Sequence, residues 1–222
     1  MERTAQPGQT GPLPPFRFLE RGVGVKGMRA SLALKRGLDV LFSLFLLLLF
    51  SPLFLLFSLW IRGEDGGGVF FRQQRLGKDC RVFEIVKFRS MVPNAEHKGA
   101  GIHVGQGDER ITRVGRFLRK TSLDELPQLW NILKGDMSFI GPRPPLTFFP
   151  YRCTEYPESV KVRFGMRPGM TGLAQVNGRN EIPWEERFPF DVAYVEKWSL
   201  ALDWKIFWKT LILVVRRKGI YG

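Results

Sequence analysis

The sequence predicts a mostly helical α/β protein, in which an apolar helical segment inserts into a membrane and precedes a small domain with a short sheet. Three observations support this fold class. An apolar run extends from Leu38 to Ile61, apolar and charged residues alternate at 82–88, and apolar residues recur at helical spacing in several later stretches. A hydrophobic content of 44% argues against a disordered basic protein.

Residues 1–30 are expected to form a flexible leader, because they are rich in Gly, Pro, Thr and Gln and show no sustained periodicity. About 35 residues precede the apolar run, and no small-residue cleavage site follows it. Both facts argue against a signal peptide.

The apolar run at 38–61 is long enough to cross a hydrocarbon layer of ~30 Å as a helix. However, Ser51-Pro52 lies near its middle, where proline removes a backbone hydrogen bond and kinks the helix. The flanks are basic on both sides, whereas a single span should show asymmetry. The basic flanking residues are Lys26, Arg29, Lys35 and Arg36 before the run, and Arg62, Arg72, Arg75 and Lys78 after it. The residues alone leave two structures open: a transmembrane span, and a helix–break–helix that enters and leaves on one face.

Two short strands are predicted at 69–77 and 80–91, around the turn Gly77-Lys78-Asp79. A Gly-rich stretch at 93–109 then predicts a mobile loop. It contains His97 and His103, which lack the spacing of metal ligands, so we do not expect a zinc site.

A basic helix or turn is predicted at 110–120, where five cations are interleaved with apolar residues at helical spacing. Such a stretch commonly forms a solvated or headgroup-facing surface. Because it leads directly into two carboxylates, it also suggests a place for phosphates or a metal-bridged phosphate.

Asp124 and Glu125 begin a stretch with one apolar helical face formed by Leu126, Leu129, Trp130 and Leu133. Ser122 followed by Glu125 matches a capping box, and carboxylates favour the first turn of a helix. This window by itself is therefore explained by helix capping, and a catalytic role depends on its surroundings.

Turns rich in Gly and Pro follow at 141–145, 167–172 and 177–180. Arg143 lies between two prolines, which would hold its guanidinium on a stiff segment suited to binding a phosphate with two hydrogen bonds. Exposed backbone N–H groups in the later turns can line a nucleotide pocket.

The C-terminal part is predicted to be helical from about Pro183. Its aromatic residues, interspersed with Lys and Arg, are typical of a helix at a membrane interface, and packing on the domain core is the alternative. These aromatic residues are Tyr194, Trp198, Trp204 and Trp208.

A net charge of +13 and a pI near 10.2 indicate an anionic partner: nucleic acid, an anionic membrane surface or a phosphorylated substrate. Cys80 and Cys153 are far apart and form no CxxC or Cys/His cluster. We expect them to be reduced thiols in a cytosol-facing protein, with a disulfide as the less favoured alternative.

These pieces in this order resemble the bacterial sugar transferase family, the monotopic phosphoglycosyl transferases that start glycan assembly. The resemblance covers roughly residues 30–215, and three motifs carry it: KFRSM at 87–91, RKTSLDELPQLWNILKGDMSFIGPRP at 119–144 and RPGMTGLAQVNGRN at 167–180. It implies a re-entrant membrane helix at 31–62 broken at Ser51-Pro52. It also implies a catalytic domain at 63–222 with interfacial C-terminal helices, on the cytoplasmic face of the bacterial inner membrane.

The resemblance also implies an activity: a phospho-sugar moves from a UDP-sugar to undecaprenyl phosphate, and UMP is released. Asp124 matches the family's nucleophile, which forms a covalent phospho-sugar, and Mg²⁺ is implied at Asp124 and Glu125. Lys87, Arg119 and Arg143 match basic positions around the phosphates. Arg179 matches a position in the loop associated with the nucleotide sugar, and Asp191 matches an acidic position near the site.

Two other classes of protein remain as alternatives. One is a basic, membrane-attached protein that binds anionic lipid or nucleic acid, and the other is a multi-span phosphotransferase, which a single apolar run disfavours. On the sugar transferase interpretation, the partners are anionic membrane lipids and possible downstream glycosyltransferases, with no nucleic acid. The chain departs from larger relatives in its extra leader and its lack of additional membrane helices, so we expect a minimal catalytic unit. No motif identifies the sugar.

Overall fold

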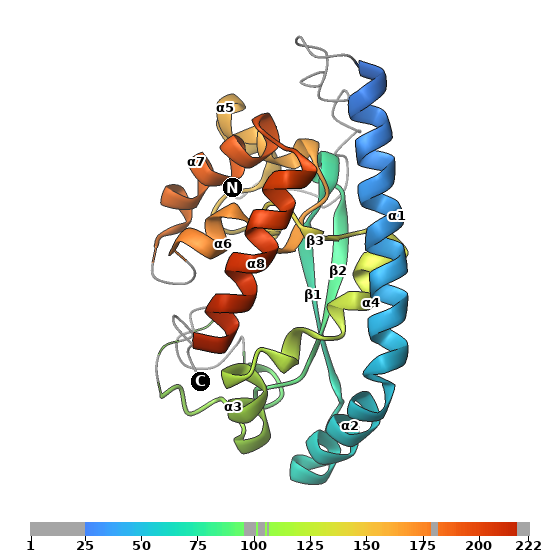
Figure 1. Cartoon of the computed structure of the whole chain (residues 1–222). Helices are drawn as coiled ribbons and strands as arrows, with labels where there is room; N and C mark the ends of the chain where they lie inside the picture. The colour runs from blue at the N-terminus through green and yellow to red at the C-terminus, as the bar shows by residue number, and fades with distance from the viewer. Residues whose placement is uncertain (1–24, 96–100, 102–104, 106, 179–181, 217–222) are drawn as a thin grey trace, which may run out of the picture.

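The computed structural model describes residues 25–95, 101, 105, 107–178 and 182–216. This part of the chain is mostly helical, with two separate two-stranded sheets. Figure 1 shows α1 and α2 along one side of the molecule, a long β-hairpin in the centre, and the helices from α5 to α8 on the other side. The predicted mixture of helices with a short sheet is therefore confirmed, whereas the predicted leader at 1–30 lies largely outside the described residues.

Two helices, α1 (Val25–Leu49) and α2 (Ser51–Asp65), replace the single apolar run of the sequence. Proline at the start of α2 interrupts the helical hydrogen bonds, and the two axes differ by 60°. Among the described residues, no single helix is both long and apolar enough to cross a bilayer, but this bent pair meets that criterion by length and composition. Many of its apolar side chains are exposed, among them Leu41, Leu48, Leu55 and Leu59.

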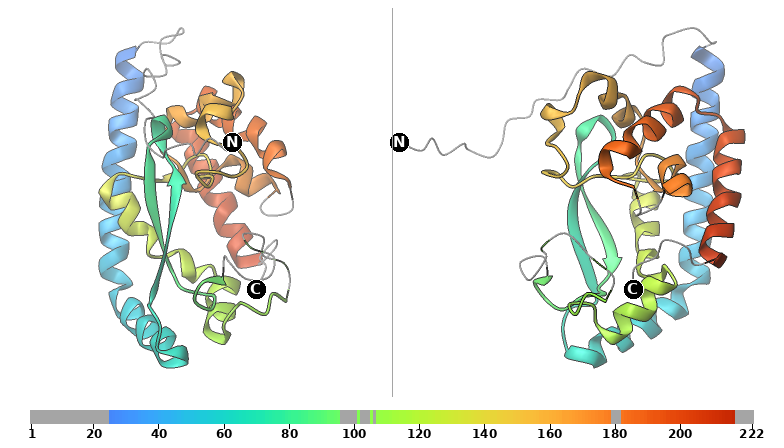
Figure 2. Two further views of the ribbon diagram at one scale, coloured as in Figure 1. Left: turned by 180° about the vertical axis from the view of Figure 1, so that it is seen from behind. Right: turned by 90° about the vertical axis from the view of Figure 1, so that its left-hand side faces the viewer.

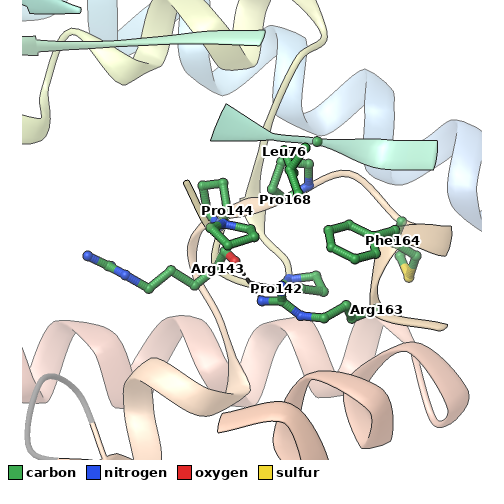
Figure 3. A pocket seen from close by; sticks show the side chains of 10 residues that line it. Leu76, Pro142, Arg143, Pro144, Arg163, Phe164 and Pro168 are labelled. Atoms are coloured by element: carbon green, nitrogen blue, oxygen red, sulfur yellow. Dashed lines mark hydrogen bonds between the residues drawn. The ribbon is translucent and has the colours of Figure 1, made fainter. Parts of the chain in front are cut away.

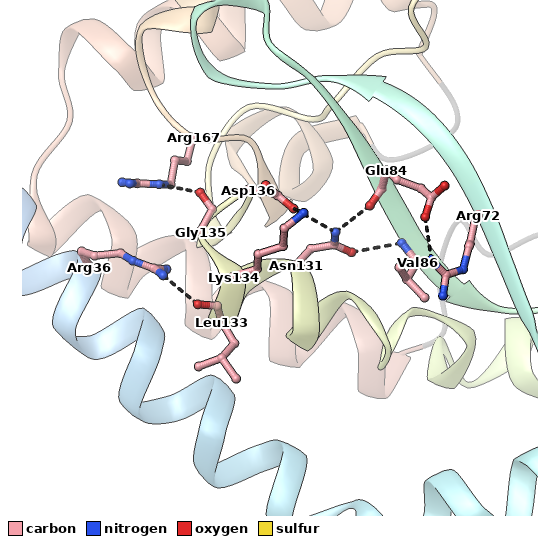
Figure 4. A network of polar contacts seen from close by, with 10 residues as sticks. All are labelled: Arg36, Arg72, Glu84, Val86, Asn131, Leu133, Lys134, Gly135, Asp136 and Arg167. Carbon is pink, nitrogen blue, oxygen red and sulfur yellow. Dashed lines mark hydrogen bonds and ion pairs between the residues drawn. The ribbon is translucent and has the colours of Figure 1, made fainter.

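The middle of α1 is bonded to elements from distant parts of the sequence. Arg36 donates hydrogen bonds of 2.6 and 2.9 Å to the carbonyls of Ile132 and Leu133, at the end of α4 (Gln128–Lys134), as Figure 4 shows in part. Asp39 accepts a hydrogen bond from the backbone N–H of Phe139 in β3 (Ser138–Ile140). These bonds fix α1 against the domain.

The predicted hairpin is confirmed. Strands β1 (Phe70–Leu76) and β2 (Val82–Phe88) are antiparallel and pair along their whole length. Asn131 of α4 satisfies the free edge of β2: its side-chain oxygen accepts from Val86 N–H at 3.0 Å, and its amide donates to the Glu84 carbonyl at 2.7 Å (Figure 4). The hairpin and α4 are therefore locked in register.

The predicted basic helix is α3 (Arg113–Lys120), and the end of α2 holds its N-terminus. Glu64 accepts hydrogen bonds from the backbone N–H groups of Arg113 and Val114, at 2.7 and 3.2 Å. Phe57 and Ile61 of α2 pack in one apolar cluster with residues of β2 and α3. Thus α1 is attached to α4, and α2 is attached to α3.

The C-terminal part forms a second group of elements around the other small sheet. Strand β4 (Gly169–Thr171) pairs in parallel with β3, and short helical segments precede and follow it. The remaining elements are η5 (Cys153–Glu155), α5 (Glu158–Lys161), η6 (Val162–Gly165), α6 (Leu173–Gly178), α7 (Trp184–Glu196) and α8 (Leu200–Arg216). Figure 2 shows α8 beside α1, where Lys35 pairs with Asp203 at 2.7 Å.

The predicted interfacial aromatic residues divide into two groups. Trp204 and Trp208 are 61% and 49% exposed on α8, as an interfacial helix requires. Tyr194 is fully buried instead, and Trp198 is half-buried; the Tyr194 hydroxyl and the Trp198 indole N–H donate to Asp203 at 2.7 and 3.2 Å. The interfacial interpretation is wrong for Tyr194, because its polar tip has a buried partner and its ring belongs to the core.

The expectation of reduced thiols is also wrong in this structure. Cys80 and Cys153 are joined by a disulfide, with their Cα atoms 6.1 Å apart. Both cysteines pack against one apolar cluster, which brings the hairpin turn next to η5. Their separation of 73 residues in sequence gave no indication of this contact.

Candidate active site

The two carboxylates Asp124 and Glu125 lie in a short 3₁₀-helix, η4 (Leu123–Glu125), between α3 and α4. The predicted capping box is absent: Ser122 adopts a left-handed conformation with φ of 58°, and its side chain caps nothing. Pro127 explains this difference, because in a continuous α-helix its ring would clash with the carbonyl of Leu123. Capping therefore does not account for the carboxylates.

Glu125 is bound by a lysine from the hairpin. Lys87, at the end of β2, donates a 2.5 Å hydrogen bond to Glu125 Oε1, and both side chains are largely but not fully buried. Gln128, at the first position of α4, also hydrogen-bonds Glu125. The structure thus brings two residues of the predicted site, distant in sequence, into direct contact.

The two carboxyl groups differ in their pKa. Removal from water, with a further contribution from the charge of Glu125, raises the pKa of Asp124 to about 6, against the opposing effect of Lys87 and Arg119. Removal from water would also raise the pKa of Glu125, but Lys87 and Arg143 outweigh it and hold that pKa below its usual range. Because neighbouring groups move the two pKa values apart, the pair has the electrostatic character of an active site.

Among the cations at 110–120, Arg119 is the one that influences the pKa of Asp124. Arg119 contributes to lowering the pKa of Asp124, whereas Arg113, Arg116 and Lys120 lie on the exposed face of α3. Arg110 is bound to Asp108 through Nε at 2.9 Å and Nη2 at 2.6 Å, so it is committed to its own loop. The five predicted cations therefore lie in three different places: one near the carboxylates, three on the exposed face of α3, and one bound within its own loop.

Arg143 lies on the stiff segment that its flanking prolines predicted. Behind it, Gly141 N–H donates to Thr171 O and Gly169 N–H donates to Pro142 O, both at 2.9 Å. A Cβ on Gly169 would lie 2.1 Å from Gly141 N, so only glycine allows these two backbones to approach so closely. Figure 3 shows the Arg143 side chain extending away from the small cavity beneath it.

Two further arginines, Arg75 and Arg187, lie near Arg143 and were not identified as site residues from the sequence. Burial and the charge of Arg143 lower the pKa of Arg75, whose Nη1 donates to the Pro144 carbonyl. Burial and Arg143 also lower the pKa of Arg187, which donates to the carbonyl of Ile182. No motif marked either residue, because single arginines in a strand and a helix are ordinary surface residues in sequence.

The last two predicted site residues have different outcomes. Asp191 of α7 is completely buried and pairs with Arg163 of η6 at 2.6 Å, and this pair contacts the backbone of Arg143. Asp191 is therefore connected to Arg143 through Arg163. Arg179 lies outside the described residues.

The donor set suits a magnesium ion that shares substrate oxygens. Within the described residues, no group of three or more potential metal-ligating side chains occurs. Asp124 and Glu125 offer two adjacent carboxylates, and Mg²⁺ is commonly held by one or two carboxylates together with substrate phosphates and water. The residues present therefore fit that ion, with the remaining ligands supplied by substrate and water.

Comparison with known proteins places this chain in a family. The family model described as bacterial sugar transferase matches residues 30–217, and the chain belongs to the bacterial sugar transferase family.

Several curated proteins are similar to it. The undecaprenyl-phosphate galactose phosphotransferase of Salmonella typhimurium is 41% identical over 87% of this chain and 43% of its own length. The exopolysaccharide production protein ExoY of Rhizobium meliloti is 40% identical over 84% of this chain and 88% of its own length. The UDP-glucose:undecaprenyl-phosphate glucose-1-phosphate transferase of Caulobacter vibrioides is 41% identical over 84% of this chain and 72% of its own length. The chain thus spans less than half the length of the Salmonella relative.

Proposed function

We propose that this protein transfers a sugar 1-phosphate from a UDP-sugar to undecaprenyl phosphate. The observation that supports it most directly is the arrangement of Asp124 and Glu125 among Lys87, Arg119 and Arg143. Two anionic substrates must meet at one carboxylate in this reaction, so cations are needed to neutralise the phosphates. Relatives named for transfer to undecaprenyl phosphate support the same substrate classes.

Asp124 is the proposed nucleophile. One of its oxygens forms a bond to the β-phosphorus of the UDP-sugar, while the bond from that phosphorus to the oxygen bridging to the α-phosphate breaks and UMP departs with the electron pair. A phosphate oxygen of undecaprenyl phosphate then attacks the same phosphorus. This second step releases the Asp124 carboxylate and yields an undecaprenyl diphospho-sugar.

The other residues stabilise charge during both steps. Lys87 keeps Glu125 ionised, so that a second carboxylate able to bind a metal ion lies beside Asp124. When bound by Asp124 and Glu125, Mg²⁺ would supply further neutralisation of the phosphate oxygens. Arg119 and Arg143 are the proposed phosphate-binding residues, and we keep Arg179 as a proposed residue of the nucleotide-sugar loop.

The bent pair α1–α2 is the proposed membrane attachment. Its exposed apolar residues and its 60° bend fit a re-entrant helix, with both ends on the cytoplasmic face. The exposed cations of α3 and the exposed Trp204 and Trp208 of α8 would then contact anionic lipid headgroups. The domain at 63–222 would place the carboxylates at the lipid surface, where undecaprenyl phosphate is available.

The deciding experiment uses the first step alone. The purified chain is incubated with UDP-glucose, UDP-galactose or their N-acetyl analogues and Mg²⁺, without acceptor, and its intact mass is measured. We expect a phospho-sugar adduct on Asp124, release of UMP, and ping-pong kinetics once acceptor is added. Asp124→Asn and Asp124→Ala should abolish both the adduct and transfer, whereas Asp136→Asn, a carboxylate at the end of α4, should retain them.

The alternative of a lipid-binding protein predicts a different result. If Asp124→Asn retained full function, or if no UDP-sugar gave an adduct and the kinetics were sequential, the proposal would be abandoned.

A further inference from the structure

A fully buried ion pair between an arginine and an aspartate lies outside the carboxylate site. Arg163 of η6 is 1% exposed, and its Nε and Nη2 donate hydrogen bonds of 3.1 and 2.6 Å to Asp191 Oδ2. Asp191 is itself fully buried. The ion pair therefore lies inside the domain and has no direct access to substrate.

Aromatic rings enclose the Arg163 guanidinium. Its central carbon lies 5.2 Å from the ring centroid of Phe164 and 5.6 Å from that of Phe188, with Tyr156 and Trp184 at 5.9 and 6.0 Å. Such contacts favour a cation and restrict its rotation. The guanidinium is thus fixed in orientation as well as buried.

One of its hydrogen bonds is directed to the active site. Nη2 of Arg163, besides binding Asp191, donates a 2.7 Å hydrogen bond to the backbone carbonyl of Arg143 (Figure 3). Burial raises the pKa of Asp191, and the backbone N–H of Arg143 is among the groups that oppose this effect. Both polar backbone groups of Arg143 are therefore turned towards the buried pair.

Stability alone does not explain this pair. Burying two charges costs several kcal/mol per ion, and apolar residues of similar volume often serve stability as well or better. Apolar residues cannot, however, donate a hydrogen bond to the Arg143 carbonyl. That bond holds the backbone of a residue whose guanidinium acts on Glu125, and within the described residues that guanidinium makes no hydrogen bond of its own.

We propose that Arg163 and Asp191 are positioning residues, which fix the backbone at Arg143 so that its guanidinium meets the phosphates of the UDP-sugar. Asp191 orients Arg163, Arg163 holds the Arg143 carbonyl, and the flanking prolines transmit that position to the side chain. Neither residue touches the substrate. The inference rests on the proposed function, because it assigns Arg143 to the donor phosphates.

The first test separates positioning from stability. In the double variant Arg163→Met/Asp191→Leu, both buried charges are removed together, so neither is left unpaired. We expect its melting temperature to stay near or above that of the wild type. We also expect kcat/KM for the UDP-sugar to fall about 10- to 100-fold, mostly through KM, because a displacement of about 1 Å can cost that much. A separate measurement, the affinity for UDP by calorimetry, should weaken in parallel.

The second test asks whether Arg163 acts through Arg143. Arg163→Met/Asp191→Leu is combined with Arg143→Gln, and all variants are compared in a double-mutant cycle. Once Arg143 is gone, the buried pair should have little further effect. Arg163→Lys keeps the buried positive charge but lacks the planar guanidinium. Its fall in kcat/KM should therefore be smaller than that of the double variant. The control is Lys161→Met, which removes the nearby Lys161–Glu158 ion pair and should leave KM unchanged.

Two results would overturn the inference: a wild-type KM and UDP affinity in the double variant, or losses that add independently to those of Arg143→Gln. If the double variant does not fold, the same two criteria apply to Arg163→Lys. Failure of the proposed function would look different, because the wild-type protein itself would neither bind UDP nor transfer a phospho-sugar.

Discussion

Asp124 is held where its negative charge is costly. Its pKa of about 6 in the folded protein exceeds the ordinary value near 3.9, so ionising it opposes folding. This cost is absent below about pH 4, increases between pH 4 and 6, and is complete above pH 6. The proposed nucleophile, whose charge is destabilised in the resting protein, would gain more on binding a phosphorus atom or a cation.

Asp124→Asn should therefore stabilise the protein at pH 8 while abolishing transfer. The expected gain in the free energy of unfolding is about 1–3 kcal/mol, because Asn resembles the neutral acid in shape without its charge. At pH 4 the two proteins should be equally stable. Thermal unfolding in detergent at both pH values measures this, and equal melting temperatures at pH 8 would contradict it.

The first chemical step should depend on pH in the same range. UMP release without acceptor should increase with pH as Asp124 ionises, with an apparent pKa at or below 6, because Mg²⁺ bound by the two carboxylates would favour the ionised form. Omitting the acceptor avoids the titration of its phosphate. In Glu125→Gln the residual activity should rise at a lower pH, since the charge of Glu125 raises the pKa of Asp124. A flat profile from pH 4 to 8 would count against this assignment.

At the residue scale, motifs in the sequence predicted Asp124, Glu125, Lys87 and Arg143 as one site, and the structure brings them together. Arg75, Arg163 and Arg187 were missed. Their contribution depends on burial and on contacts with backbone carbonyls far away in sequence, and no local pattern records such contacts. Asp191 was associated with the site, but its position beneath Arg143 required the fold.

The elements that hold the site follow from local sequence to different degrees. The hairpin, α3 and the break at Pro52 were predicted, because alternation, helical periodicity and proline act over a few residues. The start of α4 was placed too early, since the capping pattern at Ser122 competes with Pro127 and the proline prevails. Trp130, assigned to the apolar face, is 57% exposed, and the polar Gln128 and Asn131 are buried instead.

Besides the apolar packing of α2 on α3, one carboxylate of α2 bonds the backbone at the start of α3. Glu64→Ala should remove the acceptor for two backbone N–H groups at the start of α3 and destabilise that helix by about 1 kcal/mol. Hydrogen exchange of the Arg113 and Val114 amides should accelerate. Glu109→Ala, an exposed carboxylate in the preceding loop, serves as the control. Unchanged exchange in the Glu64 variant would show that the contact is unimportant in solution.

The bend between α1 and α2 is the element on which the proposed membrane topology depends. In the wild type, single cysteines introduced at Arg29 and Arg62 should be labelled from the same side of the membrane. Pro52→Leu restores the missing N–H and removes the ring, so the helix should straighten towards a full span and label from opposite sides. Opposite-side labelling in the wild type would exclude the re-entrant arrangement.

At the scale of the whole molecule, the disulfide joins the turn of the hairpin to the C-terminal group of elements. Reduction should lower the free energy of unfolding by about 2–4 kcal/mol, because a long loop is released in the unfolded chain. The melting temperature should fall on addition of a reductant, whereas Cys80→Ser/Cys153→Ser should be insensitive to it. An equal response of both proteins would mean that the disulfide does not form in solution.

The attachment of α1 to α4 and of α2 to α3 has a mechanical consequence. Only two residues separate α3 from η4, and only two separate η4 from α4. The angle between α1 and α2 therefore sets the distance that this short connection must cover. With α1 and α2 as the proposed membrane attachment, a bilayer whose thickness or curvature opened or closed that angle would stretch or compress the turn that contains Asp124. On this proposal, the physical state of the lipid would act on the proposed nucleophile through backbone geometry, without any lipid molecule binding near it.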